Sequence, residues 1–190
     1  MLAINDTRQP FRYTMNMLRL SALCLLLGCK PAPEPCTDQG NRVGECAPDF
    51  SLGRADGGEW TLSDHSGQVV LVQFAASWCG VCQMTAATGQ TLVDDYRDDG
   101  FEKVTILKGN AQYQAAERDD AIEWKEAFEL AHPVLYDPEK LVWSEWKHKT
   151  STVPQQFIVD RQGAIRWRRI GLTSEDQMRL HIEETLAQRD

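Results

Sequence analysis

Two cysteines with two residues between them, Cys79 and Cys82, are the side chains of this sequence best suited to covalent chemistry. They follow the apolar run 69–75, which is typical of a strand buried on both faces. The apolar residues after them recur every four positions, which predicts a helix over about 80–98. At a helix N-terminus, unpaired backbone N–H groups and the helix dipole stabilise a thiolate. We expect Cys79 to be an exposed nucleophile that attacks a partner disulfide, and Cys82 to resolve the mixed disulfide.

The same cysteine spacing also occurs in half of a metal site. Zinc usually takes four ligands, and the other candidates are the distant Cys36 and Cys46 or four scattered histidines. A position between a strand and a helix, with Trp78 before the first cysteine, favours redox chemistry over metal binding. We therefore expect no metal. No glycine-rich phosphate loop follows a strand, so we also expect no cofactor.

The elements that position the cysteine pair alternate along the chain. The expected strands lie at 69–75, 103–108, 134–135, 156–160 and 164–170, the last two forming a hairpin. After the helix at 80–98, further helices are expected with Ala121, Trp124, Phe128 and Ala131 on one face, at 141–147, and from Ser174 onward in a capping box with Gln177. Strands that alternate with helices predict an α/β fold, a central mixed β-sheet flanked by helices.

Three motifs, in this order, resemble the thioredoxin-like superfamily, especially the TlpA/ResA-like redoxins of bacterial envelopes. Residues 47–52 are similar to the entry strand of these proteins, and residues 69–82 to their active-site segment. Residues 151–160 are similar to the segment that holds a cis-proline. The resemblance implies a thioredoxin-like fold over residues 47–190 and the activity of a thiol–disulfide oxidoreductase.

The resemblance also implies roles for single residues. The Val153–Pro154 bond is expected to be cis and to face Cys79, so that a substrate can pair with the backbone of Val153 as a short strand. Trp78 is expected to shield the disulfide at the substrate surface. The implied partners are protein thiols and disulfides.

Departures from the family pattern affect the expected chemistry. Gln73 stands where thioredoxin has a buried Asp that relays a proton to the resolving cysteine, so that relay must be absent or replaced. Gly80 and Val81, between the cysteines, include no histidine that would stabilise a thiolate, which favours a reductant over an oxidant. A reductant in an oxidising compartment needs an electron donor, which we expect in the membrane or periplasm.

The N-terminal region is typical of export. Three arginines precede the apolar run 20–27, which is too short to span a bilayer but suits a secretory signal. Residues 26–29 resemble the bacterial lipobox, after which Cys29 would carry lipid. The alternatives are a signal peptide without lipid or a buried helix that ends in cysteine.

The chain is expected to divide into a lipoprotein signal peptide at 1–28, a tether at 29–46 and a thioredoxin-like domain at 47–190. They predict a lipid-anchored protein facing the periplasm, and Lys30 slightly favours the outer membrane.

The net charge of the chain bears on which partners it can bind. The net charge is −8, and removal of residues 1–28, which hold three Arg and one Asp, makes it −10. An acidic surface argues against nucleic acid as a partner. We also expect a monomer.

Cys36 and Cys46 are expected to form a local disulfide. The alternatives are a second redox pair that relays electrons to Cys79 or Cys82, and two free thiols.

Two other functions compete with disulfide exchange. A copper-binding or assembly lipoprotein of the Sco-like kind would use both cysteines and a histidine, for which His132 and His148 are loose candidates. A peroxiredoxin-type peroxidase needs a Pro and a Thr upstream of its reactive cysteine. Val72 and Ala76 occupy those positions here.

Overall fold

The computed structural model describes residues 36–188. The predicted signal peptide, the predicted lipidation site Cys29 and the first part of the predicted tether lie outside the described residues. Within residues 36–188, no helix is both long enough and apolar enough to cross a bilayer.

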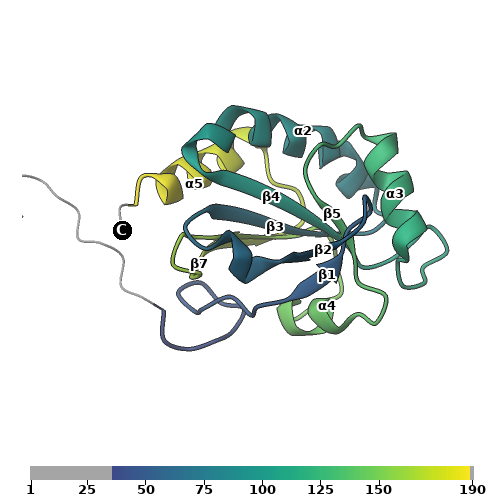
Figure 1. The fold of residues 1–190 in the computed structure, drawn as a ribbon, viewed down its shortest axis with the longest axis horizontal. Coiled ribbons are helices and arrows are strands. Elements are labelled where there is room, and N and C mark those ends of the chain that lie inside the picture. The colour runs from purple at the N-terminus through teal and green to yellow at the C-terminus, as the bar shows by residue number, and fades with distance from the viewer. Residues whose placement is uncertain (1–35, 189–190) are drawn as a thin grey trace, which may run out of the picture. The chain divides into compact units, whose positions relative to one another are not determined.

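A five-stranded sheet in the order β5-β4-β3-β6-β7 forms the centre of the fold (Figure 1). Its strands are β3 (Val69–Ala75), β4 (Phe101–Leu107), β5 (Val134–Tyr136), β6 (Gln155–Val159) and β7 (Ile165–Ile170). The first three run parallel, β6 runs antiparallel to β3, and β7 pairs with β6 as a hairpin. Strands β1 (Ser51–Gly53) and β2 (Glu59–Thr61) form a separate antiparallel pair. The mixed sheet between helices confirms the predicted fold class.

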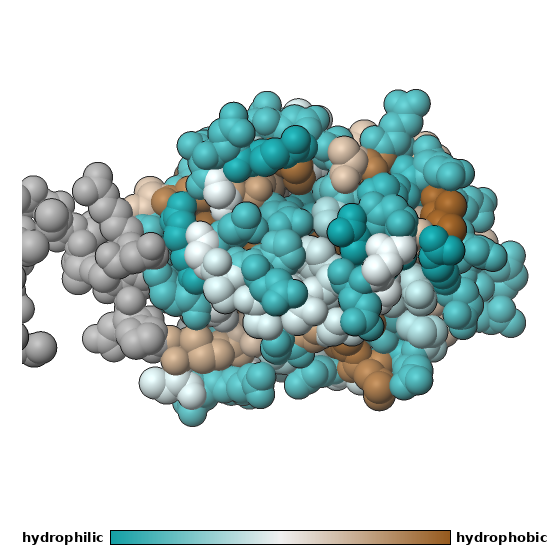
Figure 2. Space-filling view, viewed as in Figure 1, coloured by the Kyte–Doolittle hydropathy of each residue, from teal (hydrophilic) through white to brown (hydrophobic). Residues whose placement is uncertain are grey.

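Helices cover both faces of the sheet. They are α2 (Gly80–Tyr96), α3 (Arg118–Ala127), α4 (Leu141–Trp146) and α5 (Glu175–Leu186), with 3-10 turns at Leu62–His65 and Arg97–Asp99. Figure 1 shows α2 and α5 together on one side of the sheet and α4 on the other. The face drawn in Figure 2 is covered mainly by hydrophilic residues, with hydrophobic residues in small separate patches.

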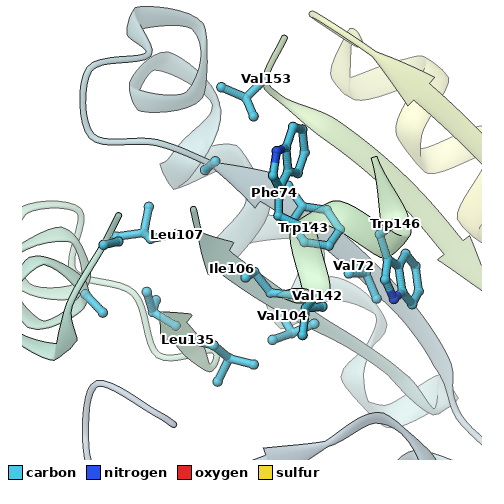
Figure 3. Packing of buried hydrophobic residues seen from close by; sticks show 14 of the residues in the cluster. Val72, Phe74, Val104, Ile106, Leu107, Leu135, Val142, Trp143, Trp146 and Val153 are labelled. Atoms are coloured by element: carbon cyan, nitrogen blue, oxygen red, sulfur yellow. The ribbon is translucent and has the colours of Figure 1, made fainter. Parts of the chain in front are cut away.

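Strand β3 is buried along its whole length because both of its faces are covered. Its side chains alternate, so that Val69 and Leu71 join α2 and α5 in one cluster while Val72 and Phe74 join α4 in the other. Figure 3 shows the second cluster, in which Trp143 and Trp146 of α4 lie near Phe74, at centroid distances of 5.4 Å and 5.9 Å. A strand held on both faces gives Cys79, four residues after its end, a rigid support.

Two segments differ from the expectations. Helix α3 ends at Ala127, because Glu129 adopts a left-handed backbone conformation (φ 51°). Phe128 therefore follows the helix, and Ala131 is exposed while Leu130 is buried in its place. In the last helix, Ser174 accepts from the backbone N–H of Gln177 at 3.4 Å, which is one half of the expected capping box.

The described part of the predicted tether is folded against the sheet. The backbone N–H groups of Gly44 and Ala47 donate to Ile165 and Gly163, and the N–H of Ile165 donates to Glu45. Residues 36–46 thus cover part of the outer edge of β7, where unpaired backbone groups would otherwise be open to other chains.

Candidate active site

The two cysteines lie where strand β3 leads into helix α2. Cys79 is the N-cap of α2, and its Sγ accepts from the backbone N–H of Cys82 at 3.1 Å. The structure joins the two in a disulfide with a Cα–Cα distance of 5.2 Å. Cys79 is 6% exposed, so the expectation of an exposed nucleophile is wrong for this oxidised form. Cys82 is 0% exposed, so Cys79 is the more accessible of the two sulfurs. An N-cap thiolate is stabilised by the N–H groups of the first helical turn.

A cis-proline segment lies directly against Cys79. The Val153–Pro154 peptide bond is cis, and the carbonyl oxygen of Val153 is 3.5 Å from the Sγ of Cys79. In the dithiol form, this distance allows the thiol S–H to donate to that carbonyl. The arrangement brings Trp78, Cys79, Cys82, Val153 and Pro154 together at one end of the sheet, as the sequence predicts.

A buried amide, which the sequence reasoning did not single out, organises the loop before the cis-proline. Gln155 is 0% exposed. Its Oε1 accepts from the backbone N–H of His148 at 2.8 Å, and its Nε2 donates to the carbonyls of Thr150 and Thr152 at 3.0 Å and 3.1 Å. Three hydrogen bonds from one buried side chain fix the backbone that leads into Val153. The only signal in the sequence is a polar residue next to a proline at the start of a buried strand.

Trp78 forms the other wall of the site with residues that follow β4. Its ring stacks on that of Tyr113 with centroids 5.4 Å apart and planes at 22°. The Nζ of Lys108 lies 5.4 Å from the centroid of Trp78 and 4.7 Å from that of Trp143, and it donates to the carbonyl of Ser151 at 3.3 Å. Lys108 therefore links the residue before Cys79 to the loop before the cis-proline.

Gln73 occupies the buried position where thioredoxin has an acid. It is 3% exposed and pairs in register with Thr105 of β4 and Gln156 of β6. All the nearest ladder partners of Gln73 are uncharged. A groove of about 290 Å³ between α2 and the start of α5 is lined in part by Gln73, Gln156 and Lys103.

Lys103 is the centre of a buried polar cluster on the same face of the sheet. Its Nζ donates to Thr105 Oγ1 at 2.7 Å and to His132 Nε2 at 3.0 Å, while His132 Nδ1 lies 3.0 Å from Gln90 Oε1. Burial lowers the pKa of Lys103 to about 7. Burial, and then the charge of Lys103, lowers the pKa of His132, so that its ring is neutral. Lys103 packs closely against Gly89: a Cβ added at Gly89 would lie only 2.6 Å from the Cε of Lys103.

The second cysteine pair lies at the other end of the β6–β7 hairpin. Cys36 and Cys46 are joined in a disulfide, and Cys46 bridges to Ala164, just before β7. The carbonyl of Pro154 accepts from the N–H of Gly171, just after β7. An extended chain from 164 to 171 spans roughly 20 Å. At this separation the disulfide Cys36–Cys46 cannot exchange directly with Cys79 in this conformation.

The histidines that a copper site would need have other partners. His132 lies in the buried cluster with Lys103 and Gln90. The ring nitrogens of His148 lie 2.8 Å and 3.1 Å from the guanidinium of Arg168. Among residues 36–188, no three or more His, Cys, Asp or Glu side chains gather in a group that could hold a metal ion.

Comparison with known proteins identifies a family and several relatives of this chain. The AhpC/TSA family matches residues 43–168. A thiol–disulfide oxidoreductase, ResA, of Geobacillus thermodenitrificans is 25% identical over 141 residues, which cover 74% of this chain and 76% of that protein. The thioredoxin-like protein YneN of Bacillus subtilis is 24% identical over 144 residues, covering 76% of this chain and 81% of that protein.

Solved structures share the architecture. A protein described as a thiol:disulfide interchange protein, DsbE, from Chlorobium tepidum superposes with a TM-score of 0.65 at 26% identity, covering 77% of this chain and 99% of that chain. The exposed lipoprotein thioredoxin of Streptococcus pneumoniae superposes with a TM-score of 0.62 at 24% identity, over 72% of this chain and 99% of that one, and supports the fold alone. With its cysteine pair at the N-terminus of α2 and its cis-proline against Cys79, the chain belongs to the AhpC/TSA family and has the thioredoxin-like fold.

Proposed function

We propose that this protein is a thiol–disulfide oxidoreductase that exchanges disulfides with protein thiols through Cys79 and Cys82. The observation that carries the proposal is the position of Cys79, which caps helix α2 and lies 3.5 Å from the carbonyl of Val153. The names of the relatives support it, because ResA and DsbE are described as proteins of thiol–disulfide exchange.

The proposed cycle balances as a two-electron reduction of the partner. The Cys79 thiolate attacks one sulfur of the partner disulfide, forms a mixed disulfide and releases the other sulfur as a thiolate. The Cys82 thiolate then attacks the Sγ of Cys79, which releases the second partner sulfur and leaves the Cys79–Cys82 disulfide. Two electrons from a donor dithiol in the membrane or periplasm return the pair to the reduced form.

The direction and location belong to the same proposal. Gly80 and Val81 add no histidine beside Cys79, which supports a reductant. The residues before the domain support a lipid-anchored protein of the bacterial envelope, with Cys29 as the lipidated residue and the outer membrane slightly favoured. We propose that it acts as a monomer. Radiolabelled palmitate should enter the full chain and fail to enter the Cys29→Ser variant. Equal labelling of both would refute lipidation at Cys29.

Trapping of the mixed disulfide tests the mechanism. We expect the Cys82→Ser variant, in its reduced form, to accumulate a covalent complex with a disulfide-containing protein, and Cys79→Ser to form none. Both variants should lose turnover. Trapping by Cys79→Ser instead, or full turnover without Cys79, would refute the assigned roles. A peroxiredoxin-type peroxidase is the alternative function, so hydrogen peroxide should be offered in the same assay. Consumption of peroxide faster than disulfide reduction would favour a peroxidase.

A further inference from the structure

Lys108 is a cation at the edge of the active site with no acidic partner. It is half-buried, and its Nζ lies between the rings of Trp78 and Trp143 and donates to the carbonyl of Ser151. Within residues 36–188, the structure shows no carboxylate within ion-pair distance of it. A carbonyl and two aromatic faces satisfy an ammonium less completely than water and a carboxylate do.

The charges that act on Lys108 are also positive. Lys140 and Lys147 flank helix α4, whose Trp143 lies 4.7 Å from the Nζ of Lys108. Burial, and then the charges of Lys140 and Lys147, lowers the pKa of Lys108. The carboxylate of Asp137, whose backbone N–H donates to Leu107 next to Lys108, is 1% exposed. It accepts from the backbone N–H of Trp143 at 2.7 Å, so it is engaged with the first turn of helix α4. Three lysines without acidic partners are gathered at this place in a protein whose net charge is −8. Like charges that are held together without a counter-ion favour the binding of an anion.

We propose that Lys108, Lys140 and Lys147 form a cationic rim beside Cys79 that binds an acidic side chain of the substrate polypeptide near its reactive cysteine. This inference rests on the proposed function, since it names the substrate class of the same site. Trp78 and Ser151 connect the rim to both walls of that site, because Trp78 precedes Cys79 and Ser151 lies three residues before the cis-proline Pro154. A polypeptide that extends from Cys79 along this side therefore passes the Lys108 ammonium.

The acidic side chain should contribute mainly to binding and to selectivity. Partly exposed ion pairs contribute modestly and are screened by salt, so we expect a preference of about 3- to 10-fold rather than an absolute requirement. The preference should appear as a lower half-saturating concentration, with little change in the maximum rate, because the rim does not touch the exchanging sulfurs.

Three peptides that differ at one position test the rim. Each carries a cysteine in a mixed disulfide with thionitrobenzoate, and Glu, Gln or Lys two residues away. The reduced wild-type protein releases thionitrobenzoate from each peptide, and the absorbance gives the half-saturating concentration and the maximum rate. We expect the half-saturating concentrations to rise from Glu to Gln to Lys, and the differences to shrink in 0.5 M NaCl as the Debye length falls to a few ångströms.

Two variants and one control assign the preference to the rim. Lys108→Gln should reduce the Glu-to-Lys ratio to below about 2-fold, and the double variant Lys140→Gln with Lys147→Gln should also reduce it, so that the test stands if one of them folds poorly. Arg97→Gln removes the same charge at the far end of α2 and should keep the ratio. Equal half-saturating concentrations for the three peptides in the wild type, or a ratio unchanged in both rim variants, would overturn the inference while leaving the proposed function intact. Failure to reduce any peptide would overturn the proposed function, and the inference with it.

Discussion

Replacing Lys103 by Met should stabilise the protein at neutral and mildly acidic pH. Lys103 is 1% exposed, and its two hydrogen-bond partners, Thr105 and His132, are uncharged. Methionine keeps the length and most of the volume of the apolar stem. Because Thr105 Oγ1 and His132 Nε2 are also 3.0 Å from each other, they can pair once the ammonium is removed. The variant therefore removes a buried charge without leaving unpaired polar groups.

The magnitude follows from the pKa of this one group. Burial lowers the pKa of Lys103 from 10.5 to about 7 in the folded protein. The unfolded chain therefore binds more protons between these two values, and the folded state loses stability as the pH falls through this window. At about 1.4 kcal/mol per pKa unit, the whole window corresponds to about 5 kcal/mol of unfolding free energy. The part between pH 9 and pH 6 corresponds to about 3 kcal/mol.

Urea unfolding of the oxidised protein at pH 6 and at pH 9 measures this difference. The free energy of unfolding of Lys103→Met, minus that of the wild type, should be about 3 kcal/mol larger at pH 6 than at pH 9. Lys149→Met changes an exposed lysine and should give a difference close to zero at both values. If the Lys103→Met difference is the same at both pH values, Lys103 does not titrate in this window. If the variant is less stable at both, its hydrogen bonds outweigh the cost of burying its charge.

Two further predictions concern packing and the second cross-link. Gly89→Ala should lower the free energy of unfolding by about 1–3 kcal/mol, because the added Cβ would lie 2.6 Å from the Cε of Lys103. Gly80→Ala is the control, since a Cβ there meets no atom within 4 Å. Equal losses of stability for both variants in thermal denaturation would contradict this reasoning. Replacing Cys36 and Cys46 together by Ser should lower the free energy of unfolding by about 3 kcal/mol, because it opens the cross-linked loop. The rate of thiol exchange at Cys79 should stay the same. A slower exchange would show that this loop acts on the active site.

The sequence was sufficient for the main elements of the fold. Strand β3 is recognisable because a seven-residue apolar run suits burial on both faces, and the cysteine pair then marks the start of α2. The hairpin of β6 and β7 follows from its turn residues. The end of α3 could not be predicted, because apolar spacing continues through Phe128 and Ala131 while the backbone turns at Glu129.

The site was harder to predict where it depends on tertiary contacts. Cys79 and Pro154 belong to motifs, so their sequence context indicates them. Gln155 and Lys108 belong to no motif, and their importance comes from partners in other loops, at His148, Thr150 and Ser151. Lys108 directly follows a parallel strand, at the end of the sheet where α/β proteins place their sites, and this position is the available signal.

Residues 36–46 show that composition alone does not predict whether a polar segment is folded. Their Gly and polar residues are typical of a spacer, yet the Cys36–Cys46 disulfide closes them into a loop whose backbone pairs with β7. Asn41 adds hydrogen bonds to the carbonyls of Glu145 and Lys147, each 3.2 Å long. A covalent cross-link lowers the entropy of a polar segment enough for it to fold onto an edge strand.

Because the two disulfides are separated along the β6–β7 hairpin, we expect each to be reduced independently of the other. In equilibrium with a thiol buffer, the molecules of the protein divide among four redox species, and the fraction of each is the product of two separate Nernst terms. Alkylation of Cys36, Cys46, Cys79 and Cys82 would then add zero, two or four labels, and the mass with two labels would contain two different redox species. A midpoint fitted to total free thiols would average the two couples. The potential of the Cys79–Cys82 pair has to be followed by a probe of that pair alone, such as the fluorescence of Trp78.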